Sequence, residues 1–438
     1  MMKRVSLMIL VVLLVATLAA VAGAQETITL RYFMWDPIFA DMERALIDEF
    51  EAQNPHIKVE MTAMDPSSYW PRISAMATAG ELPDVFNMST GYFEQWAQDG
   101  LLLNIQELVN RDLNIEDYFV EVFSENRYPD KQTGDMYAIP YAWVTPVLFY
   151  NKDMFDEAGL SYPSDDWTWD DFLEAAKKLT IQSDPRLPAE RYGFFWYGRY
   201  AHVEPWVYAN SGRILNEEKT RIQFDERARE ALQFLSDLTN VHKVSPPYKE
   251  IVGISQDDLF PLRQVAMWVD GSWNIENIRQ KADPDFRFGI ARVPKGPSAI
   301  PGDDTTYFWP DAIAISATTQ HKEAAWELVK FLIGENRPIE SYMAGKVPIH
   351  KGLAHSEEWL QAGKDPDNMQ LILEQGEGTG RTTFTLGWSE WRGYAATGSS
   401  GMNGELDKVS NGEQSVDEAI KAITEYGNSV LTRYYPEE

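Results

Sequence analysis

The chain has 438 residues, with 39 Lys plus Arg against 67 Asp plus Glu, no cysteine and a formal net charge of −28. Such a length exceeds what one ordinary hydrophobic core holds, so two lobes or domains are expected. The negative charge argues against nucleic acid and anionic lipid as partners. The lack of cysteine excludes disulfides, thiolate metal sites and cysteine nucleophiles, together with a lipid-accepting cysteine anchor.

The first 24 residues have the pattern of a cleaved secretory signal. Lys3 and Arg4 precede an apolar run from Val5 to about Val21, and the small residues 22–24 form a cleavage site before residue 25. We expect cleavage there and export to the periplasm without a lipid anchor. The alternative is an uncleaved membrane anchor, for which the apolar run is barely long enough.

The first part of the mature chain alternates between strand-like and helix-like segments. Strand patterns cover residues 27–33, 57–64 and 83–89, and helix patterns cover residues 38–53 and 69–79. This alternation indicates an α/β domain with a mainly parallel sheet. Such sheets bind ligands at the carboxyl ends of their strands, so the loops at those ends are the first candidates for a site.

The rest of the chain continues in the same style. Its patterns predict strands over 138–151, 265–271 and 286–294, and helices over 168–180, 225–240, 321–333, 368–375 and 415–432. Thr168 and Asp225 are the expected N-caps of the first two of these helices. No internal repeat and no low-complexity linker is visible, so we expect the chain to cross between its lobes in short strand segments.

The usual catalytic signatures are missing from the sequence. It has no GxSxG elbow, no HExxH zinc helix and no GxxxxGK[ST] phosphate loop. The histidines are scattered, and His350 and His355 stand at a spacing that suits no common metal site. The run Asp-Pro-Asp-Asn at 365–368 lacks the glycine and the terminal glutamate of a calcium loop. We therefore expect no catalytic residues, no metal and no cofactor.

Aromatic residues are the most informative feature of the composition. The sequence has 15 Trp, many of them in segments that read as strand ends and turns. Aromatic faces stack on the apolar C–H face of a sugar ring, while carboxylates and amides bind its hydroxyls. The candidates for this role are Trp35, Trp143, Trp206, Trp273, Trp309, Trp388 and Trp391. Trp96, Trp326 and Trp359 lie in helical patterns, where core packing is expected instead.

One long segment carries a family resemblance. The residues Val147 to Thr180, VLFYNKDMFDEAGLSYPSDDWTWDDFLEAAKKLT, resemble the extracellular solute-binding proteins of ATP-driven importers, in the sugar-binding group that includes the maltose-binding protein. Further matches are AGELPDVFNM at 79–88, VAMWVDGSW at 265–273, FGIARVPKGP at 288–297 and AAWELVKFLIG at 324–334. Their order and spacing agree with the family over almost the whole mature chain.

The resemblance implies a two-lobed periplasmic-binding-protein fold of type II, an α/β fold in which each lobe is a mainly parallel sheet flanked by helices. It implies an N-terminal lobe at 25–140 and 292–335 and a C-terminal lobe at 141–291 and 336–438, joined by a multi-strand hinge. Ligand would bind between the lobes, and hinge closure would present it to the permease subunits of an ABC importer. We expect the protein to be a monomer.

Site residues follow from the resemblance together with the aromatic pattern. Trp273 comes after the glycine turn at which the family stacks a sugar on an aromatic ring. The other expected ligand-binding residues are Trp35, Asp36, Asn87, Tyr92, Trp143, Trp206, Asp270, Trp309, Trp388 and Trp391. Val144, Gly91 and Tyr92 replace charged ligand contacts of the maltose binder, so a saccharide other than maltose is expected.

Three alternatives stay open at this point. A phosphate ester such as glycerol phosphate would need a cation in the site, and Arg199 and Arg392 are available. A polyamine would need clustered carboxylates, and the candidates are Asp36, Glu204, Asp270 and Glu390. A secreted glycoside hydrolase would need two carboxylates about 5 to 9 Å apart across the sugar.

Overall fold

The computed structural model describes residues 27–35, 37–184, 188–334, 345–361, 363–376, 380–394 and 401–436. The expected signal peptide and the candidate Asp36 lie outside these residues. The chain divides into two compact units, which are Met1–Phe86 with Thr318–Arg337 (unit 1) and Asn87–Ala317 with Pro338–Glu438 (unit 2). The lobe boundaries expected from the sequence stay a prediction.

Unit 1 is built on parallel strands. Its elements are β1 (Ile28–Trp35), η1 (Pro37–Phe39), α2 (Ala40–Gln53), β2 (Ile57–Met64), α3 (Pro66–Ala79), the start of β3 (Val85–Ser89) and α13 (Lys322–Ile333). All eight residues of β1 pair in parallel with β2, and Tyr32 and Phe33 of β1 pair in parallel with the start of β3. Phe50 of α2 packs on Phe331 of α13 with ring centroids 5.4 Å apart. This part of the chain has the parallel arrangement that the sequence predicts.

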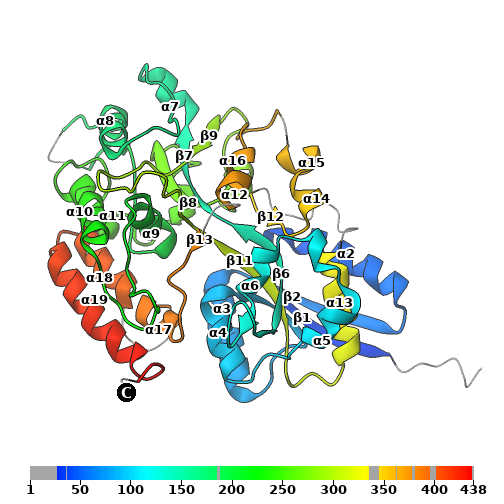
Figure 1. Ribbon diagram of the computed structural model, residues 1–438. Coiled ribbons are helices and arrows are strands. Elements are labelled where there is room, and N and C mark those ends of the chain that lie inside the picture. The colour runs from blue at the N-terminus through cyan, green and yellow to red at the C-terminus, as the bar shows by residue number, and fades with distance from the viewer. Residues whose placement is uncertain are drawn as a thin grey trace, which may run out of the picture. The chain divides into compact units, whose positions relative to one another are not determined.

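Unit 2 holds the remaining elements (Figure 1). Its strands are β4 (Arg127–Tyr128), β5 (Asp135–Met136), β6 (Ala138–Val144), β7 (Pro146–Asn151), β8 (Met267–Gly271), β9 (Phe288–Ala291), β10 (Thr306–Tyr307), β11 (Trp309–Ile315), β12 (Val347–Pro348) and β13 (Gly380–Arg381). Its helices are α4 (Thr90–Gln98), α5 (Gln106–Asp112), η2 (Ile115–Asp117), α6 (Val120–Ser124), α7 (Lys152–Glu157), α8 (Trp169–Leu179), α9 (Tyr200–Ala209), α10 (Glu226–Asn240), α11 (Tyr248–Ile251), η3 (Gln256–Asp258), α12 (Asn274–Lys281), α14 (Lys351–Ala354), α15 (Glu357–Leu360), α16 (Gln370–Gly376), α17 (Trp388–Arg392), α18 (Gly401–Ser410) and α19 (Val416–Leu431).

Two sheets meet where β6 continues into β7. β6 pairs antiparallel with β11 and β12, and β7 pairs antiparallel with both β8 and β9. The expectation of a mainly parallel sheet is therefore wrong for β8, β7 and β9. The physical reason is the continuation from β6: the chain enters this sheet at the carboxyl end of β8, where Pro146 pairs with Gly271, and must run against its neighbours.

Thr145, the residue between β6 and β7, is fully buried and ties three segments together. Its hydroxyl donates to the carbonyl oxygen of Tyr307 at 3.1 Å, and its carbonyl oxygen accepts the N–H of Ser272 at 2.9 Å. The segment after β8 and the segment before β11 are thereby held at the point where the chain changes sheets. These two segments carry Trp273 and Trp309.

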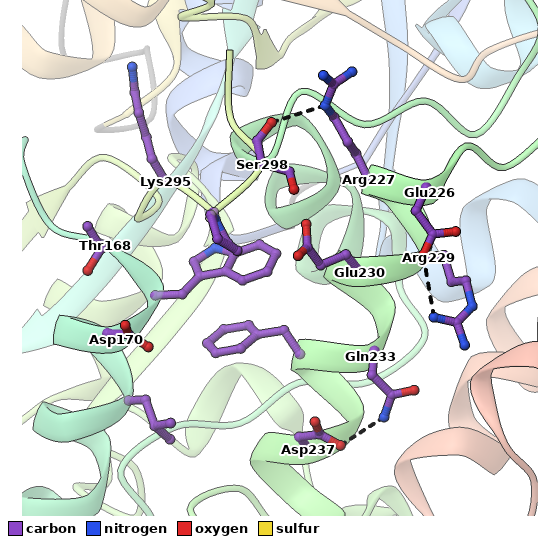
Figure 2. A pocket seen from close by; sticks show the side chains of 15 residues that line it. Thr168, Asp170, Glu226, Arg227, Arg229, Glu230, Gln233, Asp237, Lys295 and Ser298 are labelled. Atoms are coloured by element: carbon purple, nitrogen blue, oxygen red, sulfur yellow. Dashed lines mark hydrogen bonds and ion pairs between the residues drawn. The ribbon is translucent and has the colours of Figure 1, made fainter. Parts of the chain in front are cut away.

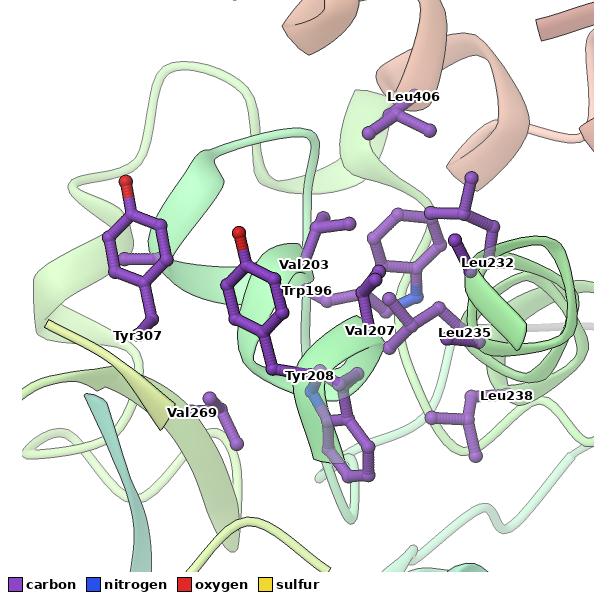
Figure 3. Close-up of a cluster of buried hydrophobic side chains, with 14 of the residues drawn as sticks. Trp196, Val203, Val207, Tyr208, Leu232, Leu235, Leu238, Val269, Tyr307 and Leu406 are labelled. Atoms are coloured by element: carbon purple, nitrogen blue, oxygen red, sulfur yellow. The ribbon is translucent and has the colours of Figure 1, made fainter. Parts of the chain in front are cut away.

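Helices α9, α10 and α18 enclose a buried apolar cluster in unit 2 (Figure 3). The α10 side chains Leu232, Leu235 and Leu238 recur at helical spacing and face Val207 of α9, which follows from the amphipathic pattern of residues 225–240. Trp196 packs among them and is almost fully buried, with its indole N–H donating to Thr239. The cluster also includes Met267 and Val269 of β8.

Most of the predicted elements are confirmed within one or two residues at each end. Residues 57–64 form β2 as predicted, and Thr168 caps α8 in a reciprocal capping box with Asp171. Asp225 caps α10 by accepting the N–H of Ala228. Helix α9 is not among the elements expected from the sequence, because Pro205 lies inside this helix and the segment is rich in aromatics. Within the described residues, every helix is too short or too polar to cross a membrane.

Thr145→Val should lower the free energy of unfolding by about 1 to 3 kcal/mol, because it leaves the buried carbonyl oxygen of Tyr307 without its donor at almost unchanged side-chain volume. Urea unfolding of the two proteins measures this change. Thr133→Val is a matched control, since the Thr133 hydroxyl donates to Asp130 in an exposed turn. Equal costs for the two substitutions would contradict the bridging role of Thr145.

Candidate functional site

Six aromatic rings of unit 2 gather near the passage from β6 to β7. We call them the aromatic cluster; its members are Tyr200, Trp273, Tyr307, Trp309, Trp388 and Tyr394. They come from the start of α9, the turn after β8, β10, the start of β11, and α17 with the residues that follow it. The carboxyl end of β8 contributes to the cluster, which is where the α/β pattern of the sequence placed its candidate loops.

Tyr200 is the centre of the cluster. Its ring centroid lies 5.4 Å from Trp309, 5.6 Å from Trp388 and 6.0 Å from Tyr394, in edge-to-face arrangements. Trp273 meets Trp309 edge to face at 5.2 Å, and Trp388 stacks on Tyr394 at 5.1 Å. Edge-to-face contacts between neighbours leave ring faces turned in different directions.

Part of the cluster is open to solvent. Trp273 and Tyr200 are half-buried and Tyr394 is 38% exposed, whereas Trp309 and Trp388 are only 3% and 4% exposed. Two buried polar groups, the indole N–H of Trp388 and the hydroxyl of Tyr307, have no hydrogen-bond partner among the described residues. Buried polar groups are normally paired, so these two groups are exceptions within the cluster.

Trp273 is seated on a glycine. Its six-membered ring lies over Gly271, so that a Cβ added there would be 1.8 Å from Cζ3 of the indole. Only a residue without a side chain allows this ring to lie against the end of β8. The glycine turn that singled out Trp273 in the sequence therefore has a steric cause.

Trp388 rests on a second glycine in the same way. A Cβ added to Gly91 of α4 would lie 2.6 Å from Cε3 of Trp388 and 3.2 Å from the Phe384 ring. Gly91 is one of the positions where the sequence departs from the maltose binder. Here the missing side chain lets α4 approach the face of α17 that carries Trp388.

A charged group borders Trp273. The Arg199 guanidinium lies 5.4 Å from the centre of the Trp273 ring and 5.9 Å from that of Tyr200. Its Nη1 is 3.2 Å from Asp270 and 3.9 Å from Asp257. The fully buried Asp270 also lies 3.3 Å from Nε2 of His202 and accepts the N–H of Gly271. Asp270 therefore anchors Arg199 beneath the edge of the cluster.

The burial of this group sets its protonation. Burial alone would raise the pKa of Asp270, but Arg199 and His202 lower it below its usual value, so Asp270 is ionised. Burial lowers the pKa of His202 more than Asp270 raises it, which leaves the imidazole neutral. Burial, and then Asp270, raise the pKa of Asp257, while Arg199 acts in the opposite direction.

A second buried ion pair supports α17. Nε of Arg392 lies 3.2 Å from Oε1 of Glu204 on α9, and both side chains are fully buried. Thr383 donates its hydroxyl to Glu204 at 2.9 Å, and Arg392 donates to the carbonyl oxygen of Gly198 at 3.0 Å. Burial raises the pKa of Glu204 to about 7, although Arg392 and Thr383 lower it. The helix that carries Trp388 is thus fastened to α9 by a carboxyl group that titrates near neutral pH.

The structure brings several of the expected site residues together. Trp273, Trp309 and Trp388 are members of the aromatic cluster, and Asp270 holds the arginine beside it. Half-buried Tyr92 on α4 lies one residue beyond Gly91, near enough to Tyr394 for the two hydroxyls to influence each other electrostatically.

Other expected site residues lie elsewhere. In unit 1, Trp35 is 6% exposed and packs on Tyr69 and Trp70 with ring centroids 5.3 and 5.8 Å away. Asn87 is buried in β3 and donates to the hydroxyl of Tyr141 at 3.2 Å. Trp143 is buried in β6 between Phe119 and Phe308.

Three of the tryptophans expected in loops, Trp206, Trp388 and Trp391, lie in helices. Trp206 belongs to α9, is fully buried and packs on Phe172 at 4.9 Å and on Phe194 at 5.6 Å. Trp391 in α17 is fully buried and donates its indole N–H to Thr385. Their assignment to turns is wrong, because the helices that contain them are too short or too irregular to give a clear periodic pattern. Trp96, Trp326 and Trp359 are buried as expected.

Tyr200, Tyr307 and Tyr394 are not among the site residues expected from the sequence. Tyr200 sits beside Arg199 in the run Tyr-Gly-Arg-Tyr, where four polar or small residues interrupt a strongly apolar stretch. Such an interruption can predict the exposed start of a helix. Tyr307 and Tyr394 carry no comparable local signal, because only the folded chain places them beside Tyr200.

A separate cavity of about 620 Å³ lies between the start of α8, α10 and the turn at 295–298 (Figure 2). Its wall contains Trp169 stacked on Phe234 at 4.4 Å. The cations around it are already engaged: Arg229 pairs with Asp417 and Lys295 pairs with Asp304, each at 2.6 Å. None of the expected site residues lines this cavity.

A family model described as bacterial extracellular solute-binding protein matches residues 37–336 of the chain. The match spans well over half of the sequence. The chain belongs to this family. The resemblance found in the sequence is therefore confirmed, and the members of this family are binding proteins rather than enzymes.

Individual relatives agree with the family assignment. The multiple sugar-binding protein of Streptococcus mutans serotype c is 23% identical over 323 residues, which are 70% of this chain and 71% of that protein. The sn-glycerol-3-phosphate-binding periplasmic protein of Shigella dysenteriae serotype 1 is 23% identical over 446 residues, 95% of each chain.

A solved structure shares the fold. The ABC substrate-binding protein of Listeria monocytogenes in complex with cycloalternan has a TM-score of 0.80 and 23% identity, covering 94% of this chain and 100% of that one. The predicted periplasmic-binding-protein fold is confirmed for this solute-binding protein.

Gly271→Ala should displace the Trp273 ring and lower the free energy of unfolding by about 1 to 3 kcal/mol through overpacking. In a Trp273→Ala background the same substitution should cost almost nothing, because its steric partner is gone. Urea unfolding of the wild type, the two single variants and the double variant measures these costs as a double-mutant cycle. Gly352→Ala is the control, since its Cβ would come no nearer than 3.2 Å to the His350 ring. Equal costs in both backgrounds would show that Gly271 does not seat Trp273.

Glu204→Gln should change how stability depends on pH. The pKa of Glu204 in the folded protein, about 7, lies above its ordinary value of 4.5, so its contribution to stability is complete below about pH 4.5 and is lost as pH rises towards 7. The free energy of unfolding should therefore fall more steeply, or rise less, from pH 5 to 7 in the wild type than in the variant. Asp407, whose pKa burial raises to about 6, contributes equally to both proteins. Parallel pH profiles would rule this assignment out.

Proposed function

We propose that this protein is the substrate-binding component of an ABC importer and that it captures a sugar or oligosaccharide at the aromatic cluster. The observation that carries the proposal is the cluster itself, with part-exposed faces of Trp273 and Tyr200 beside buried donors on Trp388 and Tyr307. A sugar ring offers an apolar C–H face to such rings and hydroxyls to such donors.

The relatives support this ligand class. The names of the Streptococcus protein and of the Listeria structure both specify saccharides. Glycerol phosphate is the alternative that the Shigella relative suggests, and it would need an unpaired cation at the cluster. A polyamine would need unpaired carboxylates. A glycoside hydrolase would need a carboxyl group that reaches the ligand and can act as an acid. Asp270 is instead fully buried and paired with Arg199 and His202.

The binding cycle that we infer is hinge closure. The lobes at 25–140 with 292–335 and at 141–291 with 336–438 would close over the ligand, and the closed form would dock on the permease subunits. A ligand that contacts both lobes favours the closed form by its extra affinity for that form. The passage from β6 through Thr145 to β7 is one strand crossing at which such a movement could pivot.

We further propose that the mature chain is a periplasmic monomer without a lipid anchor or catalytic activity. Its family is extracellular, and the sequence combines a signal-like start with no cysteine. The strongly negative net charge suits a soluble protein that diffuses between ligand capture and a membrane permease.

A thermal-shift screen tests the function. A ligand that binds only the folded state raises stability by RT ln(1 + [L]/Kd), so a saccharide at about 100 times its Kd should add about 2.7 kcal/mol. The screen should contain neutral mono- and oligosaccharides, glycerol 3-phosphate and polyamines. A shift with phosphate esters or polyamines and none with any saccharide would refute the sugar assignment.

Trp273→Ala should weaken binding of the saccharide found in that screen about 5- to 150-fold, because a stacking face worth about 1 to 3 kcal/mol is lost. Calorimetric titration measures the affinity, and a melt of the unliganded variant reports folding. Trp167→Ala is the matched control, since Trp167 is also half-buried but packs on Phe155, outside the cluster. Unchanged affinity with a collapsed melting temperature would show that Trp273 is a core residue.

A further inference from the structure

The charges around the aromatic cluster bear on a question that ring stacking leaves open, namely whether the ligand is charged. Arg199 is the cation best placed to meet a ligand, because its side chain is 24% exposed and its guanidinium lies over the rings of Trp273 and Tyr200. An acidic sugar or a sugar phosphate would take this guanidinium as its partner, since arginine binds carboxylate and phosphate in a bidentate manner.

Arg199 is not available as an unpaired charge. Asp270 lies 3.2 Å from its Nη1 and is ionised, and Asp257 lies 3.9 Å from the same atom. The two carboxylates come from different elements, Asp270 from β8 and Asp257 from η3. With His202 neutral, this group carries one positive charge and two carboxylates.

Two other cations near the cluster are buried beside a carboxyl group. Arg392 is fully buried against Glu204 at 3.2 Å. Lys346, which is 6% exposed, pairs with Asp311 of β11 at 2.8 Å, two residues beyond Trp309. Neither cation is exposed enough to contact a ligand.

Lys219 is a further cation on this side of unit 2. Its ammonium lies 3.5 Å from the hydroxyl of Thr382. Burial and then Lys131 lower its pKa to about 8, while Glu94 and Glu204 act in the opposite direction. The ammonium stays largely protonated at pH 7, and it contacts the Thr382 hydroxyl rather than a ring of the aromatic cluster.

We propose that the site selects an uncharged saccharide, and that Asp257 and Asp270 are the specificity-determining residues because their carboxylates lie beside Arg199 and leave it no unpaired positive charge. This inference rests on the proposed function and deepens it. An anionic ligand would have to lose its hydration beside Asp257 and share Arg199 with two carboxylates, whereas a neutral sugar meets no such penalty. Asp257 is the accessible member of the pair, with 38% of its side chain exposed.

Matched ligands make the test direct. Neutral hexoses and disaccharides are each compared with their uronic acid and their 6-phosphate, by thermal shift and then by calorimetric titration of the full mature chain. The neutral member should bind at least about tenfold more tightly than its anionic partners. An anionic member that binds as tightly as its neutral partner overturns the inference and leaves saccharide binding intact. No binding by any saccharide overturns the proposed function itself.

Substitutions then locate the selectivity. Asp257→Asn should reduce the preference for the neutral ligand about two- to fivefold, as expected for a part-exposed charge. Asp258→Asn removes the same charge one residue away, where it pairs with Lys281, and should leave the preference unchanged. Arg199→Gln should keep the preference for neutral sugar. If Arg199→Gln abolishes binding of an anionic ligand that the wild type binds well, Arg199 is an anion site and the proposal is wrong.

Discussion

The candidate site depends on two close approaches between an indole ring and a backbone without a side chain. Trp273 lies over Gly271 at the end of β8, and Trp388 lies against Gly91 at the start of α4. Each contact brings a ring nearer to a strand or helix than any Cβ would allow. Glycine permits this approach because it has a hydrogen atom where alanine has a methyl group. Tyr200 and Trp309 then fill the space between the two tryptophans.

The cations around the site are paired with carboxylates. Arg199, Arg392 and Lys346 each face a carboxylate within hydrogen-bonding distance, and these pairs lie behind or beside the rings. A buried pair adds little net stability when compared with apolar packing, but leaving either partner alone is costly. Such pairs therefore hold the elements in register and leave the aromatic faces as the surface that a ligand meets.

Thr145 connects this site to the architecture. The chain changes sheets at one buried residue, and hydrogen bonds from that residue reach the segments that carry Trp273 and Trp309. A movement of one sheet against the other would therefore displace the segments that carry these two rings. This is the mechanical link that a binding protein needs between ligand contact and a change of shape.

Local rules were enough to predict much of this protein from its sequence. The N-cap at Thr168 and the strand at 57–64 follow from neighbouring residues, and so does the burial of Trp326 in a helical pattern. The family resemblance added the fold and pointed to Trp273.

Only the tertiary structure decided which tryptophans meet. Trp206 and Trp273 look alike in sequence, yet one is sealed in a core and the other borders Arg199 at a half-open cluster. The contact between Gly91 and Trp388 joins residues almost 300 positions apart. No local pattern encodes such a contact, because the space around a ring is set by whichever distant segments pack against it.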